Sequence, residues 1–312
     1  MTQNSFGQRF GSAALLLLLP VLMQSAFADT ASDATTFVND EVRLGTTDAA
    51  INSDRAAMAA DVAAGKALKS DVLQFFIDRE AASGLHLLVA ADRKELRKDI
   101  KFNPGKNGKP GKGTGNLQQD ATTFIGDFDT LNTDEGNLDA AFQALQAATS
   151  NGNAAAITAA ANTYFTNRHA AHLARLQLLV DVSALKKDVS FKGTGDIIKR
   201  KAGGLNTDVP IFLNDRATWK TDKDQVNADV NNIRGTLTAP SSLESSVIQL
   251  LTDAHSVFLD AAQLQIDRFI MRKDAGLKTG KERKADLPYK SNAENDDSED
   301  GSLEISFIVV AK

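Results

Sequence analysis

The clearest pattern in the chain is an apolar seam with alternating spacings of three and four residues. It runs over residues 72–100 and again over residues 161–189. This spacing places the apolar side chains on one face of a long helix that packs lengthwise against another helix. Each seam therefore predicts a helix of about 30 residues, roughly 45 Å long. Its positions are Val72, Phe75, Ala82, Val89, Leu96 and Ile100, then Ala161, Tyr164, Ala171, Leu178, Leu185 and Val189.

The second pattern is an internal repeat. The segment DATTFVND at 33–40 returns as DATTFIGD at 120–127 and, more weakly, as DVPIFLND at 208–215, with offsets of 87 and 88 residues. Two further landmarks recur, a Leu-to-Phe segment at 96–102 and 185–191 and Lys-Gly-Thr-Gly at 112–115 and 192–195. Landmarks that recur in this way predict a unit present three times.

Each unit is expected to contain two helices. Asp33, Asp120 and Asp208 open the three units and suit the N-cap position, where a carboxylate accepts free backbone amides. Alternation typical of strands is nearly absent before residue 303. The sequence thus predicts an all-α fold of three consecutive long helical hairpins, six helices in all. The hairpins form either a bundle or a short helical-repeat array.

The first 28 residues have the features of a signal peptide. Arg9 gives a positive start, residues 13–23 are apolar, and Ala26-Phe27-Ala28 is a typical cleavage site. The apolar run is about 11 residues, too short for the ~20 of a membrane-spanning helix. We therefore expect an exported protein, periplasmic or extracellular, without a transmembrane segment in the mature chain. The expected divisions are 1–28 (signal peptide), 29–117, 118–205 and 206–290 (hairpins), and 291–312 (an acidic linker and one β-strand).

Composition excludes several classes of function. The chain has 35 Lys and Arg against 40 Asp and Glu, and no cysteine. The net charge of −5 argues against nucleic acid as a partner. The lack of cysteine excludes disulfides, thiolate metal sites and a cysteine nucleophile. No motif for a serine nucleophile is present, so the prediction is a protein that is not an enzyme and has no cofactor.

Basic residues concentrate in the segments that follow each hairpin. One interpretation is a basic face at one end of the molecule that binds an anionic envelope polymer or lipid headgroups. The other is the ordinary preference of Lys for helix C-termini and soluble loops. The candidate anion-binding residues are Lys106, Lys109, Lys112, Lys192, Lys199, Arg200, Lys201, Lys281, Arg283 and Lys284.

Cations also occur within the apolar seams, in phase with the apolar positions. A carboxylate recurs on the first helix of each unit, so ion pairs between the two helices are expected. Such pairs fix the register of the helices, or else line a polar pocket for an anionic ligand. A solvated helix face is the third interpretation. The predicted network is Asp40, Arg79, His86, Asp127, Arg168, Arg175, Asp215 and Arg268, with Arg268 aligned to Arg175.

Two weak metal sites are also predicted. His169 and His172 share a helical face, and Glu80 occupies the position that matches His169. Asp296, Ser298 and Asp300 resemble the start of a calcium loop, although Phe307 stands where a glutamate is needed. Calcium or another divalent metal is therefore the alternative to a metal-free protein, and a solvated acidic linker is the alternative to a calcium loop.

The end of the chain predicts a lone strand. Residues 302–310 (SLEISFIVV) have no partner strand elsewhere, so they pack on the helices or pair with another protein or another copy of the chain. The leading functional hypothesis is an exported, non-enzymatic binding or structural protein of the bacterial envelope or extracellular matrix. The alternative is a ligand carrier or sensor with a polar pocket inside the bundle, and a metal-dependent enzyme is the third.

Overall fold

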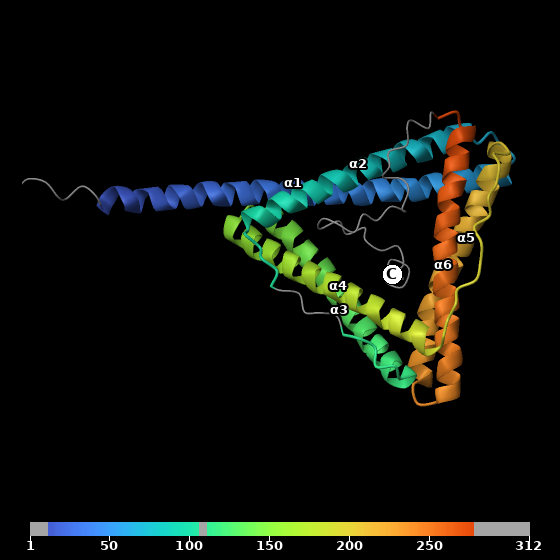
Figure 1. Ribbon diagram of the computed structural model, residues 1–312. Helices are drawn as coiled ribbons and strands as arrows, with labels where there is room; N and C mark the ends of the chain where they lie inside the picture. Colours follow the sequence, from blue (N-terminus) through green and yellow to red (C-terminus); the bar gives the residue numbers. More distant parts are fainter. Residues whose placement is uncertain (1–11, 106–110, 278–312) are drawn as a thin grey trace, which may run out of the picture. The chain divides into compact units, whose positions relative to one another are not determined.

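The computed structural model describes residues 12–105 and 111–277, with side chains from residue 29 onward (Figure 1). Within these ranges the chain forms six helices and no strand, which confirms the all-α prediction and its three helix pairs. The predicted strand at 302–310 lies outside the described residues. The helices are α1 (Ser12–Ala63), α2 (Lys69–Asp99), α3 (Leu117–Asn151), α4 (Ala154–Asp188), α5 (Leu205–Thr236) and α6 (Pro240–Asp274).

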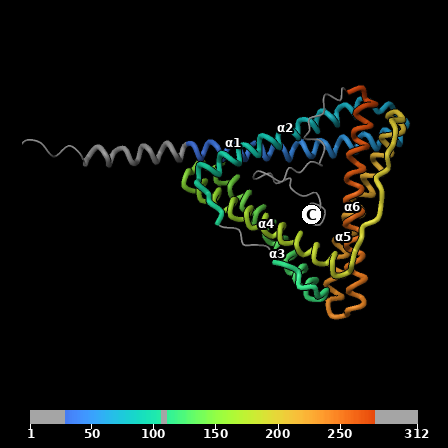
Figure 2. Tube along the Cα trace, in the orientation of Figure 1, coloured from blue at the N-terminus to red at the C-terminus, as the bar shows by residue number. Residues whose placement is uncertain are grey.

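Short turns join the two helices of each pair. Gly65 and Gly152 adopt left-handed φ values of +65° and +66° in the first two turns, a conformation that favours glycine. In the third, Pro240 occupies the start of α6, where its missing N–H costs little. Turns this short make consecutive helices antiparallel neighbours. Figure 2 traces the chain through these three turns.

The chain divides into two compact units, and α1 to α4 each contribute one part to each unit. Among the described residues, the first unit comprises 12–45, 83–105 and 135–169, and it contains a four-helix cluster that we call bundle A. Its core is aromatic: Phe37 lies edge-on to Phe142 with ring centroids 6.1 Å apart, and 5.4 Å from the centroid of Tyr164. Bundle A therefore joins the start of α1 and the end of α2 to the turn end of α3 and α4.

The second unit contains two further four-helix clusters. Bundle B combines the start of α3, the end of α4, the end of α5 and the start of α6 around buried residues that include Phe124, Leu178 and Val230. Bundle C combines the turn end of α1 and α2 with the start of α5 and the end of α6. There the ring centroids of Phe75 and Phe212 lie 5.7 Å apart.

The apolar seam is confirmed as the source of this burial. Val72, Phe75, Leu96, Ala161 and Leu185 are all fully buried. The aspartates predicted as N-caps do not occupy N-cap positions in the structure. α1 runs unbroken from Ser12, so Asp33 lies inside the helix, and Asp120 and Asp208 lie in the first turns of α3 and α5. No helix in the described ranges is long and apolar enough to cross a membrane.

Candidate functional site

Aspartates face one another across the inside of each helix pair. They recur at multiples of seven residues on both helices. Because the two helices are antiparallel, moving seven residues forward on one and seven backward on the other again brings two facing positions together. There are four facing pairs in α1–α2, two in α3–α4 and four in α5–α6, and we call them the aspartate ladder. The pairs are 33–99, 40–92, 54–78 and 61–71; 120–188 and 127–181; and 208–274, 215–267, 222–260 and 229–253.

The ladder also defines which residues of the three hairpins are equivalent. The two pairs nearest the open end of a hairpin are Asp–Asp in all three. Farther toward the turn the residues vary, and in α5–α6 the last position holds Thr236, whose hydroxyl oxygen lies 3.3 Å from that of Ser246. The three hairpins therefore share the same alignment of facing positions. They also share the two Asp–Asp pairs at the open end.

Burial, and in most pairs the facing carboxyl, raises the pKa of at least one aspartate in each pair. Desolvation is the larger cause, and it raises the pKa of Asp181 and of Asp229 to about 7. In the part of the chain that the structure describes, no N–H or hydroxyl donor reaches the buried Oδ2 atoms of Asp181, Asp229 and Asp267. A proton held between two facing carboxyls supplies the missing hydrogen bond. With pKa values raised to about 7, the carboxyls of Asp181 and Asp229 are partly protonated near neutral pH.

A glutamine one helical turn earlier supports five of the ladder aspartates. In each case the side-chain N–H of the glutamine donates to a carboxylate oxygen four residues later, a spacing at which helical side chains meet. This donor orients the carboxyl toward the facing helix. The pairs are Gln74–Asp78 (3.1 Å), Gln177–Asp181 (2.9 Å), Gln225–Asp229 (3.2 Å), Gln249–Asp253 (2.9 Å) and Gln263–Asp267 (3.0 Å).

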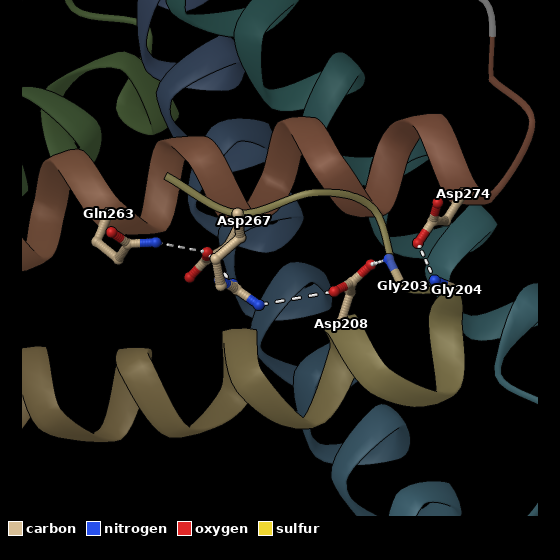
Figure 3. Close-up of polar contacts among 7 residues, drawn as sticks. Gly203, Gly204, Asp208, Gln263, Asp267 and Asp274 are labelled. Carbon is tan, nitrogen blue, oxygen red and sulfur yellow. Dashed lines mark hydrogen bonds and ion pairs between the residues drawn. The ribbon is translucent and has the colours of Figure 1, made fainter. Parts of the chain in front are cut away.

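The segments between hairpins bind the open end of the ladder. We call residues 111–116 the first connector and 192–204 the second connector. In the first, the backbone N–H and the hydroxyl of Thr114 donate to Asp120 at 2.8 and 2.7 Å. In the second, Gly203 N–H donates to Asp208 and Gly204 N–H to Asp274, each at 2.8 Å (Figure 3). Asp120 and Asp208, two of the three aspartates expected to cap helices, thus accept amides from the connectors instead.

The second connector also places an arginine in the ladder. Arg200 pairs with the fully buried Asp267 and lies 3.6 Å from Asp208, so one guanidinium links carboxyls on α5 and α6. The N–H of Ile198 donates to the amide oxygen of Gln263 at 2.9 Å, which fixes the connector along α6. Arg200 is therefore a structural cation, and its predicted role in surface anion binding does not fit this position.

Glycine lets the connectors approach the helices closely. A Cβ at Gly113 would lie 2.3 Å from the Cβ of Ala184, and one at Gly193 would lie 2.7 Å from Nε2 of His255. Both glycines belong to the recurring Lys-Gly-Thr-Gly sequence, yet they meet different parts of the following hairpin. This sequence ends the first connector and begins the second, so it does not mark equivalent positions of the repeat.

The other predicted anion-binding residues fall into two groups. Lys112, Lys192, Lys199 and Lys201 are exposed on the connectors. These connectors lie against different hairpins, the first along α4 and the second along α6. The remaining candidates lie outside the described residues: Lys106, Lys109, Lys281, Arg283 and Lys284.

The predicted interior ion pairs differ from those observed. Asp40, Asp127 and Asp215 face the ladder carboxyls Asp92, Asp181 and Asp267 instead of seam arginines. The reason is the register between the helices. The ladder aspartates Asp92 and Asp267 come one residue before the seam arginines Arg93 and Arg268, and it is the aspartate that faces the partner helix.

The seam cations themselves have separate surroundings. Arg93 pairs with Glu41 at 3.2 Å. The side chain of His86 is exposed, and those of Arg168 and Arg175 are half-buried on α4. By the ladder register Arg268 corresponds to Arg93, so its predicted alignment with Arg175 is wrong.

Arg79 and Arg268 instead belong to a group of four arginines in bundle C. The other two members are Arg55 on α1 and Arg216 on α5. Burial and the neighbouring arginines lower the pKa of Arg268 to about 9 and that of Arg55 to about 10. All four side chains are partly buried.

The structure does not assemble the predicted histidine site. Glu80 and His172 are exposed and His169 is half-buried, and the described residues contain no group of three or more His, Asp or Glu placed to hold a metal ion. Asp296, Ser298 and Asp300 lie outside the described ranges.

The ladder itself was missed by the sequence analysis. Its signal is the heptad spacing of Asp33, Asp40, Asp54 and Asp61, repeated in reverse on the next helix. Comparison with protein-family models, with curated proteins and with solved structures finds no match for this chain.

Proposed function

We propose that the chain is an exported, non-enzymatic helical protein that contacts an anionic polymer of the bacterial envelope or matrix. The observation that carries the proposal is the exposure of Lys192, Lys199 and Lys201 on a connector whose backbone is fixed to the helices behind it. A fixed backbone lowers the conformational entropy lost on binding. The lysines then act as strongly hydrated point charges toward an extended polyanion.

A matched pair of variants tests this proposal. The triple variant Lys192→Gln, Lys199→Gln, Lys201→Gln removes three connector charges. The control, Lys69→Gln, Lys94→Gln, Lys187→Gln, removes three exposed charges from helices. Binding of the mature protein to immobilised dextran sulfate should weaken at least about tenfold for the connector variant only, since each lysine near an anionic surface contributes about 1 kcal/mol. Binding should also weaken as salt rises.

Three results would count against this proposal. Equal losses in both triple variants would mean that only net charge matters. An unmodified protein that ignores dextran sulfate but binds phosphatidylglycerol vesicles would replace the polymer by a lipid surface as the partner. Absence of binding to either probe would end the proposal of an anionic surface partner.

A second candidate function is a carrier or sensor for a small ligand held among the helices. The observation that favours it is the group of four arginines in bundle C, whose charges act on one another while partly buried. Native mass spectrometry of the mature protein from its own source tests the candidate. A bound small-molecule mass supports a carrier, and a bare protein mass counts against it.

A further inference from the structure

Helices α2, α4 and α6 end in the same way, and this aligns the second helices of the three hairpins. In each, a backbone N–H three residues past the helix donates to a carbonyl five residues earlier, at 3.1, 2.9 and 3.1 Å. The last residues of the helices, all aspartates, are therefore equivalent: Asp99, Asp188 and Asp274. Counting back eleven residues gives a second equivalent set: Leu88, Gln177 and Gln263.

The two connectors make the same contact with the two glutamines of this set. The N–H of Gly111 in the first connector donates to the side-chain oxygen of Gln177 at 2.7 Å. The N–H of Ile198 in the second connector donates to the side-chain oxygen of Gln263 at 2.9 Å. Both glutamines are half-buried. Each connector therefore runs along the second helix of the hairpin that follows it in the chain.

The equivalent flank of α2 has no connector among the described residues, and it is apolar. The chain that precedes this hairpin is helix α1 itself, unbroken from Ser12. Leu88 stands where the other hairpins have glutamine, and it is 49% exposed. Its neighbour Leu87 is 68% exposed, and Gly84 and Ala91 on the same face are exposed as well. A segment that covered this flank would remove apolar surface from water.

The same flank leads to carboxyls that lack a donor of the kind the second connector supplies. Asp267 on α6 accepts Arg200 of that connector. The equivalent residue on α2 is Asp92, and no N–H or hydroxyl donor among the described residues reaches its buried Oδ2 atom. The same holds for Oδ2 of Asp99, whereas its counterpart Asp274 accepts a connector amide at 2.8 Å. A basic segment on this flank would meet acceptors as well as apolar surface.

We propose that residues 278–290 dock on this flank of α2 as a third connector. The first connector follows the first hairpin and lies on the second, and the second connector follows the second hairpin and lies on the third. Residues 278–290 follow the third hairpin and lie outside the described residues, and the first hairpin is the one left uncovered.

The sequence of this segment suits the place. It begins with Lys278, which follows Lys192 of the second connector by 86 residues, the offset that also separates Gln263 from Gln177. The segment has five basic and two acidic residues, which complement the carboxylates of the flank. Its Leu287 can add apolar contact with the exposed leucines.

The segment is long enough to reach the flank of its own chain. The guanidinium carbon of Arg272, near the end of α6, lies 5.8 Å from the centroid of the Phe76 ring near the start of α2. From Phe76 to Leu88 the helix rises about 18 Å. Thirteen extended residues span up to about 43 Å. The segment can therefore follow α2 in the direction in which the second connector follows α6.

Docking gives a structural role to three of the residues predicted to bind anions. Lys281, Arg283 and Lys284 would lie against carboxylates of α2, as Arg200 lies against Asp267. The proposed polymer binding rests on the lysines of the second connector, so the inference is independent of it and goes beyond it.

The chain has no cysteine, so a disulfide between two introduced cysteines reports docking directly. In the mature protein Leu88→Cys is combined with one cysteine of the segment at a time, which leaves the exact register open: Lys281→Cys, Ala285→Cys or Tyr289→Cys. The control replaces Leu88→Cys by Ala90→Cys. Ala90 is exposed and lies about 200° around α2 from Leu88.

Mild copper-catalysed oxidation should separate the two sets of variants. The fastest Leu88 pair should form an intramolecular disulfide at least about tenfold faster than any Ala90 pair, because docking raises the effective concentration of the two thiols. Gel electrophoresis without reductant distinguishes a disulfide within one chain from a disulfide between two chains.

Limited trypsin digestion is the second readout, and it needs no cysteine. A docked segment is cleaved only when it leaves the helix, so the cleavage rate follows the undocked fraction. The double variant Leu87→Glu, Leu88→Glu should be cleaved within 278–290 at least about tenfold faster than the unmodified protein. Ile248→Glu, at a 40% exposed position of α6, is the matched control and should be cleaved there at the unmodified rate.

Each outcome has a defined meaning. An intramolecular disulfide selective for Leu88, together with faster cleavage of the glutamate variant, supports the third connector. A disulfide selective for Leu88 that joins two chains overturns docking within one chain and assigns the flank to the segment of a second copy. Equal rates at Leu88 and Ala90, or cleavage that the two glutamates do not accelerate, overturns docking on α2. If a cysteine pair prevents folding, the digestion still decides.

Discussion

Arg200 determines the charge balance at the open end of α5 and α6. It pairs with Asp267 and approaches Asp208, and Asp267 is fully buried. Arg200→Gln leaves a buried carboxylate without its cation, so we expect the free energy of unfolding to fall by about 2–3 kcal/mol at pH 8. The loss should be smaller at pH 5, where Asp215, whose pKa is raised to about 6, holds a proton toward Asp267. Urea denaturation at the two pH values measures both.

Lys199→Gln is the control for that experiment. Lys199 is the exposed neighbour of Arg200 on the same connector, so its loss should change the free energy of unfolding by less than about 0.5 kcal/mol. If the two variants lost equal stability, or if Arg200→Gln lost as much at pH 5 as at pH 8, the ion pair would not be the source of the effect.

At the residue scale, the sequence predicts burial better than it predicts polar partners. The seam positions Val72 and Leu185 are fully buried as expected, because helical spacing alone determines which side chains share a face. The partners of Arg93 and Asp40 were mispredicted, because they depend on the register between two helices. If that register shifts by one residue, the residue opposite Asp40 changes from Arg93 to Asp92, the aspartate directly before it.

At the scale of the helices, the ladder carries the clearest expectation. Asp229 is fully buried and faces Asp253, and Gln225 donates to it. Asp229→Asn keeps the shape, can donate to Asp253 and removes one charge. We expect it to raise the melting temperature by roughly 2–4 °C at pH 8, about 1 kcal/mol, and to change it little at pH 5. Thermal unfolding followed by circular dichroism measures the shift.

The comparison variant is Asp224→Asn on the same helix. Asp224 is exposed and pairs with Lys220, so its removal should leave the melting temperature nearly unchanged at either pH. A loss of stability in Asp229→Asn at pH 8 would show that the pair is held by something other than a shared proton.

The helices themselves could be predicted from the sequence. The ladder could not, because it is recognised only when one knows which helix faces which. Aspartates every seven residues, such as Asp71 and Asp78, indicate a solvated stripe when a helix is considered alone. The stripe faces inward only because the antiparallel partner helix carries an equivalent stripe of aspartates that packs against it. The connectors were mispredicted for a similar reason, because Thr114 and Gly203 bind aspartates whose inward position the sequence does not reveal.

At the scale of the whole molecule, the three hairpins were predicted but the division of each hairpin was not. The sequence left open a bundle or a repeat array, and both assume that hairpins pack along their full lengths. The structure instead assigns the two ends of a hairpin to different four-helix bundles. The repeated seam looks alike at both ends, so apolar spacing cannot distinguish them. Aromatic residues such as Phe37 and Phe212 decide the partners by contacts across hairpins.

The ladder also predicts how stability depends on pH. Asp181 and Asp229 have pKa values raised to about 7, and those of Asp54, Asp99 and Asp260 are raised to about 6. Unfolded aspartates titrate near 3.9, so between about pH 4 and pH 7 the folded chain binds more protons than the unfolded chain. The free energy of unfolding therefore falls as pH rises through this window.

We accordingly expect the melting temperature to be at least about 5 °C higher at pH 5 than at pH 8, the opposite of a protein stabilised by ionised carboxylates. Below about pH 4 the trend should reverse, because hydrogen bonds from Thr114 and Gly115 lower the pKa of Asp120 and its protonation then costs stability. The double variant Asp181→Asn, Asp229→Asn should flatten the slope between pH 5 and pH 8. A melting temperature that rises toward pH 8, or a slope that the double variant keeps, would contradict protons shared between the ladder carboxyls.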